Sequence, residues 1–296
     1  IPASNLGRVQ IPFVYGDLDF SIDWGDGNTQ SYQGKANSAI VYHDYASAGT
    51  YTLILDGTYP NLRSTMQMGS NASVGRWRDY LTEVEIGSGW GVGTVVETNP
   101  NVNPYGQNRA VWKNAFTRCL NLEKCTFLVP NATAQWNIRG MFLYAGSNKA
   151  SALEINMDAF DFSTLKRFNQ PADQWGGSME SMFQGCGEVD FNMSSVNLSP
   201  TYPTRFDMFR FLLNYNPISG TAGVATRFKT VQQYDILLSR IVYFAERYYQ
   251  GGTGFADPYY NGQLRMGASK YSADGAVNRS KLINTYNFSI QDGGQE

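Results

Sequence analysis

The sequence predicts a mainly β chain with some helix, built as an N-terminal β-sandwich, a short irregular repeat solenoid and a helical C-terminal cap. Three observations lead to this prediction: alternating apolar and polar residues near the N-terminus, a phenylalanine phrase that recurs along residues 112–215, and an amphipathic helical pattern after residue 229. We expect the three units to span residues 1–59, 60–228 and 229–296. The 296 residues suffice for one small domain and one elongated domain.

The N-terminal unit is expected to be a small antiparallel β-sandwich. Its strand-like runs are two within residues 8–24, one at 39–45 and one at 50–57. In the second run, apolar residues alternate with Asp19, Ser21 and Asp23, so one face is apolar and the other polar. Asp26 and Gly27 then supply a tight turn, because both residue types tolerate positive φ.

Asp23 and Asp26 are weak calcium candidates in this unit, since calcium prefers clustered oxygens. Two carboxylates fall short of the roughly 6–8 oxygen ligands that calcium takes. Asp23 is expected on the solvent face and Asp26 already has a role in the turn, so we predict no metal and no cofactor. His43 is expected to pack near the turn. The hydroxyl of Tyr51 is expected to tie a loop to the sheet.

The letters DWGDG at 23–27 and HDYASAGTYTLIL at 43–55 resemble the polycystic-kidney-disease (PKD) type of immunoglobulin-like domain. That family carries a D-[WF]-G-D-G turn followed by H-x-Y-x(3,4)-G-x-Y-x-V. The resemblance spans roughly residues 8–58 and implies an immunoglobulin-like sandwich. Such domains usually begin with further strands upstream. We therefore expect that those strands have been trimmed, as a first residue Ile1 suggests, or that another chain completes the sheet near residues 1–15.

The middle unit is expected to be a solenoid with a ladder of aromatic residues in its core. The recurring phenylalanines are Phe116, Phe142, Phe183 and Phe209, and the small residues three positions after the first three are Cys119, Ala145 and Cys186. Recurrence at about 20–50 residues is typical of solenoids, in which no unit buries its apolar face alone. The 41 residues between Phe142 and Phe183 are expected to hold an insertion or a degenerate repeat.

The three cysteines, Cys119, Cys125 and Cys186, are expected to be reduced. A disulfide between Cys119 and Cys186 requires Cα atoms within about 7 Å. An intervening unit would hold them about two strand spacings of ~4.8 Å apart. We expect them to serve as small hydrophobic residues instead.

MESMFQGC at 179–186 and FNQPADQW at 168–175 resemble the BspA-type leucine-rich-repeat surface proteins of bacteria and phages. Units of that family read roughly N-M-x-x-M-F-x-G-[AC]-x-x-[FL], often followed by F-N-Q-P-I-G-x-W, and the second phrase departs at the I-G positions. The stretch 269–294 resembles the family's C-terminal unit. The resemblance covers about residues 80–294 and implies display on a bacterial cell surface or a phage particle.

The C-terminal unit is expected to close the solenoid, because an open last repeat exposes apolar surface and a strand edge. Thr230 to Gln233 has the form of a capping box, which predicts a helix from there to Tyr249. Its core-facing stripe is expected to be Tyr234, Leu237, Leu238, Ile241, Phe244, Ala245 and Tyr248. A shorter helix is expected over Ala273–Asn284, followed by a strand through Phe288 and Ile290.

Between these helices, residues 251–263 are rich in glycine and aromatic residues. One interpretation is a long surface loop. The other is a contact site for glycan or protein, with Phe255, Tyr259 and Tyr260 as candidate contact aromatics, because such rings supply large rigid contact area.

Composition and motifs argue against several function classes. The net charge is −2 with no run of either sign, which argues against nucleic-acid binding. A single histidine cannot supply a multi-histidine metal centre, and the sequence has no CxxC, GxSxG or phosphate-loop motif. No segment reaches the ~18 apolar residues of a membrane span.

We therefore predict a non-enzymatic structural and recognition module on a virion surface, as a decoration or fibre-associated phage protein. A bacterial cell-surface adhesin is the alternative. The expected partners are other structural proteins of the particle, a host-surface protein or glycan, or further copies of the chain. A further alternative is a glycan-active hydrolase. Its acid pair would come from Asp158, Asp161, Glu180 and Glu188, and needs carboxylates about 5–10 Å apart across a cleft.

Overall fold

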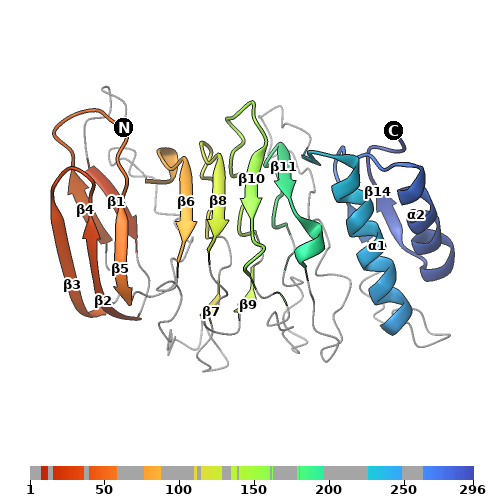
Figure 1. Cartoon of the computed structure of the whole chain (residues 1–296), viewed down its shortest axis with the longest axis horizontal. Helices are drawn as coiled ribbons and strands as arrows, with labels where there is room; N and C mark the ends of the chain where they lie inside the picture. Colours follow the sequence, from red (N-terminus) through yellow and green to blue (C-terminus); the bar gives the residue numbers. More distant parts are fainter. Residues whose placement is uncertain are drawn as a thin grey trace.

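The computed structural model describes residues 8–12, 16–36, 40–58, 77–87, 110–111, 115–128, 135–138, 140–160, 162, 179, 181–196, 226–248 and 263–296. Within these ranges the chain mixes strand and helix, with two α-helices and several sheets. The sheets of the N-terminal unit lie at one end of the molecule and the two helices at the other (Figure 1).

The strands are β1 (Arg8–Pro12), β2 (Gly16–Asp23), β3 (Thr29–Ala36), β4 (Ile40–Asp44), β5 (Ile54–Thr58), β6 (Glu83–Ile86), β7 (Ala110–Val111), β8 (Lys124–Phe127), β9 (Gln135–Asn137), β10 (Leu153–Asn156), β11 (Glu188–Phe191), β12 (Arg227–Phe228), β13 (Gln263–Arg265) and β14 (Ser289–Gln291). The helices are α1 (Val231–Tyr248) and α2 (Ala273–Tyr286), with short 3-10 helices at Trp77–Asp79 and Met193–Ser195.

Two antiparallel sheets at the N-terminus enclose one apolar core. Strand β1 pairs with β4, while β2 lies between β3 and β5. The core residues are Val9, Phe20, Ile22, Trp24, Val41 and Tyr45. The predicted alternation along β2 is confirmed, because Phe20 and Ile22 are buried while Asp19 and Asp23 are exposed.

Strand β3 is not predicted from the sequence, which shows no apolar alternation over TQSYQGKA. It nevertheless pairs with β2 along its whole length, from Gly16 opposite Ala36 to Asp23 opposite Thr29. The reason is that Ser31 and Gln33 face solvent, and Tyr32 alone supplies a large apolar contact by stacking on Phe20 at 5.3 Å between ring centroids. Backbone pairing therefore stabilises a strand whose side chains give little β signal.

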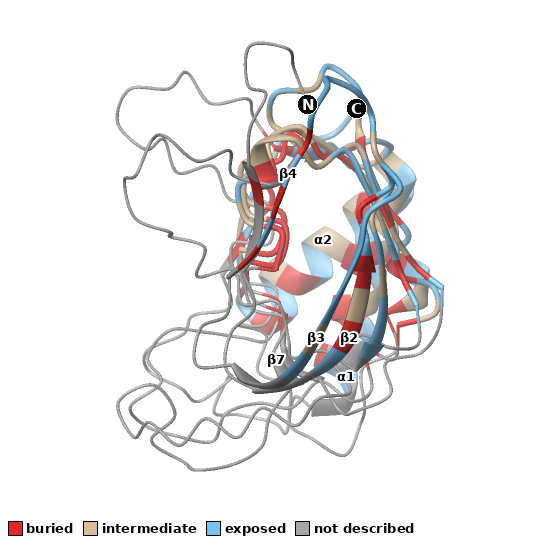
Figure 2. Cartoon of the chain, turned by 90° about the vertical axis from the view of Figure 1, so that its left-hand side faces the viewer, coloured by how far each residue is buried: buried red, intermediate tan, exposed pale blue. Residues whose placement is uncertain are grey.

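The central part of the chain forms a five-stranded parallel sheet in the order β12-β11-β10-β8-β6. The strands of this sheet are arranged in chain order (Figure 1), while β7 and β9, which lie between them in the sequence, pair with each other in a separate parallel sheet. One face is buried, with Leu153, Val189 and Phe228 in register. In the view from the N-terminal end, buried residues alternate with less buried ones along β2 (Figure 2).

The turns that precede β8, β10 and β11 stack on one another and share a residue with positive φ. The amide of Phe116 donates to the carbonyl of Met141 at 2.7 Å, and the amide of Phe142 donates to the carbonyl of Met182 at 2.9 Å. The residue two positions after each phenylalanine has positive φ: 60° at Arg118, 59° at Tyr144 and 75° at Gly185. Only the third turn has the glycine that this left-handed conformation favours.

The C-terminal unit covers the end of the sheet. Helix α1 begins with the predicted capping box, because the Gln233 amide donates to Thr230 Oγ1 at 3.3 Å and the Thr230 amide donates to Gln233 Oε1 at 3.2 Å. At the outer edge of β12, the amide of Phe228 donates to the hydroxyl of Ser269 at 3.0 Å. This hydrogen bond occupies a donor that would otherwise face outward from the last strand.

Both predicted helices are confirmed, and their contact is polar as well as apolar. Tyr234, Leu237, Leu238, Ile241 and Ala245 are fully buried along α1. Asp235 on α1 accepts from the amide and hydroxyl of Ser272, which is the N-cap of α2. Asp292 lies just after β14, accepts from the Tyr234 hydroxyl at 2.8 Å and pairs with Arg279 at 2.8 Å.

Replacing Arg118 with glycine is expected to raise the free energy of unfolding by about 0.5–1 kcal/mol. Relief of the left-handed backbone is worth ~1–2 kcal/mol and exceeds the entropic cost of glycine. Arg118 is exposed, so little packing is lost. Urea denaturation of the purified chain measures the change.

Gly185→Ala is the opposing variant and is expected to destabilise the chain. An added Cβ would approach Cδ1 of Tyr144 to 2.2 Å at a φ of 75°. Stabilisation by Arg118→Gly together with destabilisation by Gly185→Ala would support a shared turn conformation. A rise in the free energy of unfolding in Gly185→Ala would contradict it.

Candidate functional site

The predicted phenylalanine ladder lies in the turns that precede β8, β10 and β11, within the buried core of the central part of the chain. The rings of Phe116 and Phe142 stack at 5.5 Å between centroids and 18° between planes, and those of Phe142 and Phe183 at 5.9 Å and 19°. Each ring is at most 1% exposed. The fourth predicted member, Phe209, lies outside the described residues.

Direct stacking of Phe142 on Phe183 also decides what the long interval between them is. Strands β10 and β11 pair directly, with Leu153 opposite Val189, so no further strand of the sheet stands between them. The interval is therefore an insertion into one unit and not an extra repeat in the sheet.

The row of small residues follows the same geometry. Cys119, Ala145 and Cys186 each donate a backbone N–H to the carbonyl of the phenylalanine three residues earlier, at 3.2, 2.8 and 3.2 Å. All three cysteines are free and buried, as the sequence predicts. Burial raises the pKa of each thiol far above its usual range, so these groups stay protonated and are poor nucleophiles.

Phe142→Ala is expected to lower the free energy of unfolding by about 3–5 kcal/mol, because it removes the middle ring of a closely packed stack. Thermal or urea unfolding measures the loss. The control is Leu128→Ala, since Leu128 is 56% exposed and its change should stay within ~0.5 kcal/mol. Similar values for the two variants would mean that the stack contributes little.

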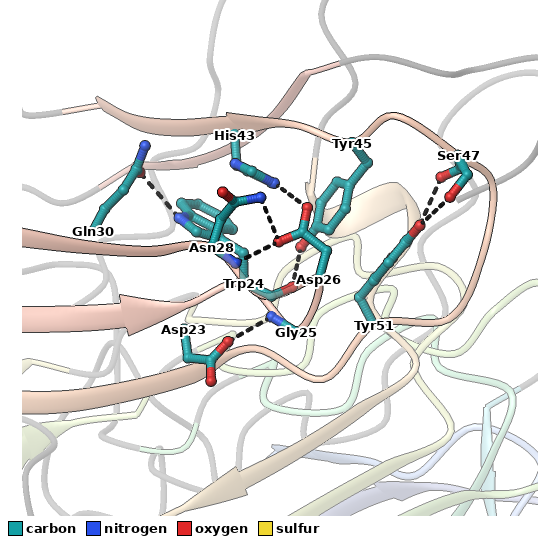
Figure 3. Close-up of polar contacts among 10 residues, drawn as sticks. All are labelled: Asp23, Trp24, Gly25, Asp26, Asn28, Gln30, His43, Tyr45, Ser47 and Tyr51. Atoms are coloured by element: carbon teal, nitrogen blue, oxygen red, sulfur yellow. Dashed lines mark hydrogen bonds and ion pairs between the residues drawn. The ribbon is translucent and has the colours of Figure 1, made fainter.

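The two calcium candidates are engaged in hydrogen bonds of the turn after β2 (Figure 3). Asp23 Oδ1 accepts from the Gly25 amide at 2.8 Å. Asp26 Oδ1 accepts from the amide and side chain of Asn28, and Asp26 Oδ2 lies 2.6 Å from Nε2 of His43. Across the ranges that the structure describes, no group of three or more His, Cys, Asp or Glu side chains could hold a metal ion.

His43 and Tyr45 fix this turn against the N-terminal core (Figure 3). The His43 ring stacks on Trp24 at 4.9 Å between centroids. The Tyr45 hydroxyl donates to the Trp24 carbonyl at 2.8 Å and so joins the ends of β4 and β2. Tyr51, which we expected to tie a loop to the sheet, donates instead to the Ser47 carbonyl within its own loop at 2.8 Å.

Stability of the N-terminal unit is expected to fall on acidification below about pH 4, the ordinary range of a carboxyl pKa. The hydrogen bond from His43 holds the pKa of Asp26 below its usual value. The folded state therefore loses this contribution as pH falls through the lowered pKa, because the unfolded state binds the proton first.

Thermal unfolding of Asp26→Asn across acidic pH tests this contribution. The variant should be less stable than the wild type near neutral pH and should lose less stability on acidification. Asp56→Asn is the control, as an exposed carboxylate on β5. Parallel pH profiles for the wild type and Asp26→Asn would contradict the assignment.

The carboxylates considered for glycan hydrolysis do not come together where they are described. Asp158 accepts from the side chain of Asn192 at 2.9 Å, and Glu188 is bound by Arg227 at 2.8 Å. Glu188 and Asn192 are separated by the length of β11, about 13 Å along an extended strand. Asp161 and Glu180 lie outside the described residues, as do the candidate contact aromatics Phe255, Tyr259 and Tyr260.

A charged row crosses the outer face of the parallel sheet and is the strongest candidate site. It consists of one residue per strand: Glu83, Lys124, Glu154, Asp190 and Lys229. The first four are aligned by the strand register. Lys229 directly follows β12 and extends the row, its Nζ lying 2.7 Å from Asp190 Oδ2. Each of the five side chains is exposed or half-exposed.

Electrostatics organise one end of this row. Asp190 accepts from Lys229 and, through its other oxygen, from Gln233 at 2.7 Å. The hydrogen bond and the negative charge of Asp190, with Glu154 and Glu188 nearby, raise the pKa of Lys229. Asp190 and Lys229 are thus held in place at this end of the row, which lowers the ordering cost of binding a complementary surface there.

Sequence reasoning did not find the charged row, although a signal for it exists. Four of its members directly precede an inward-facing residue: Val84, Cys125, Ile155 and Phe191. The same offset in every unit would have aligned them. The strands are only two to four residues long, too short for alternation to stand out.

Comparisons with known proteins do not point to a relative. No family model matches the chain, and searches of curated proteins and of solved structures gave no match. Neither α1 nor α2, the helices within the described ranges, is long and apolar enough to cross a membrane.

Proposed function

We propose that this chain is a non-enzymatic structural and recognition module that binds through the outer face of its parallel sheet. The observation that carries the proposal is the contrast between the buried, apolar inner face of the sheet and its charged outer face. Stacked rings and small residues fill the inside, whereas the outside presents charged residues at regular strand spacing. Such a rigid, preformed surface favours contact with a macromolecular partner.

The finer architecture is part of the proposal. We infer an immunoglobulin-like sandwich of the PKD type, a BspA-like leucine-rich-repeat solenoid and a capping unit. Support comes from the two sheets around Trp24, the repeated turn at Arg118 and Tyr144, and the Ser269 hydroxyl at the edge of β12. The PKD-like and BspA-like letters of the sequence point the same way.

Display on a phage virion, as a decoration or fibre-associated protein, is the setting that we favour. It follows from the BspA-like resemblance, which implies a phage particle or a bacterial surface. In this setting the partners are other structural proteins of the particle. In the alternative setting the chain is a bacterial adhesin that contacts a host protein or glycan.

Mass spectrometry of purified particles from the culture that carries the gene tests this setting. We expect peptides of the chain to band with the capsid protein through a density gradient, at a constant ratio between the two. Recovery only in the cell-envelope fraction would contradict the virion and favour the adhesin.

Incubation of the purified chain with a glycan panel tests the non-enzymatic part of the proposal, and we expect no turnover. Turnover that is lost in Asp158→Asn or Glu188→Gln, but retained in Asp56→Asn, would contradict the proposal and favour the hydrolase.

A further inference from the structure

The charged row has a sign pattern that is complementary to itself. From β6 to β12 its charges are negative, positive, negative, negative and positive. Read from the other end, every sign except the central one is reversed. A copy turned about an axis along β10 would therefore place Glu83 opposite Lys229 and Lys124 opposite Asp190.

We propose that two copies of this chain associate face to face through the charged row, around a two-fold axis along β10. The inference rests on the proposed function, because it names the occupant of the same outer face. A two-fold axis makes the interface isologous, so each of the two opposite-charge contacts occurs twice. Only Glu154 meets its own copy.

The geometry of the sheet suits this arrangement. Rotation about an axis parallel to the strands reverses the strand order and leaves the strands parallel, which is the aligned mode of sheet packing. The row covers four inter-strand spacings, about 19 Å at ~4.8 Å each. Both copies have the same spacing, so alignment of one opposite-charge contact aligns the others.

The internal ion pair of the row leaves room for a second partner. The side chains of Lys229 and Asp190 remain 42% and 35% exposed although they bind each other. In the face-to-face pair, Asp190 gains Lys124 of the other copy and Lys229 gains Glu83 of the other copy. Because these contacts are exposed at their rims, we expect weak association that salt screens strongly.

Analytical ultracentrifugation of the full chain, at high protein concentration and at low and high ionic strength, tests the proposal. The wild type should dimerise at low ionic strength and dissociate at high ionic strength. Lys124→Glu faces Asp190 with a like charge, and Asp190→Lys faces Lys124 with a like charge. Each variant alone should raise the dissociation constant at least about tenfold.

Mixing the two variants tests directly whether Lys124 of one copy faces Asp190 of the other. A heterodimer of Lys124→Glu with Asp190→Lys places opposite charges at both positions, so the mixture should recover dimers that neither variant forms alone. Recovery by mixing also shows that both variants are folded. Lys281→Glu, on α2 and remote from the row, is the control and should associate like the wild type.

A wild type that stays monomeric under all conditions overturns the inference, as does a dimer that Lys124→Glu leaves intact. So does a mixture that remains monomeric. These outcomes are separate from the test of the proposed function. A monomeric chain that still bands with particles contradicts only the dimer, and a dimeric chain absent from particles contradicts only the virion setting.

Discussion

Stacking of Phe116, Phe142 and Phe183 is the constraint from which the central structure follows. The rings repeat at 5.5 and 5.9 Å between centroids, close to the ~4.8 Å between neighbouring strands. That match keeps ring, turn and strand of each unit level with those of the next. The inward residues of the sheet and the outward charged row both take their alignment from this register. The charged residues on the outer face are therefore aligned because the buried rings on the inner side hold the strands in register.

Sequence patterns predicted the features that repeat and the features with local chemistry. The phenylalanine ladder, the reduced cysteines and the Thr230 capping box each depend on a few residues at fixed offsets, so spacing alone locates them. Strand β3 was not predicted, because its stability comes from backbone pairing with β2 and not from its own polar side chains. The hydrogen bond by which Tyr45 joins β4 to β2 was not predicted for a similar reason, since its acceptor, the Trp24 carbonyl, is a backbone group.

The charged row was missed in the sequence because the strands that carry it are too short for their alternation to stand out. Consecutive members lie 30 to 41 residues apart in the chain and become neighbours only when β6, β8, β10, β11 and β12 are aligned. Charge at one surface position carries little information, because most exposed residues tolerate it. Charge at the same position in four neighbouring strands and directly after the fifth gains meaning through its sign pattern.

Because the strands of the central sheet are added in chain order, the length of the sheet grows with the number of its units. Each unit touches only its neighbours, so duplication of one unit would lengthen the molecule by about one strand spacing and leave both ends intact. In the proposed face-to-face pair, an inserted strand would also displace the central position about which the charges of the two copies face one another. The proposed pair therefore requires a different order of charges in any relative whose sheet has a different number of strands.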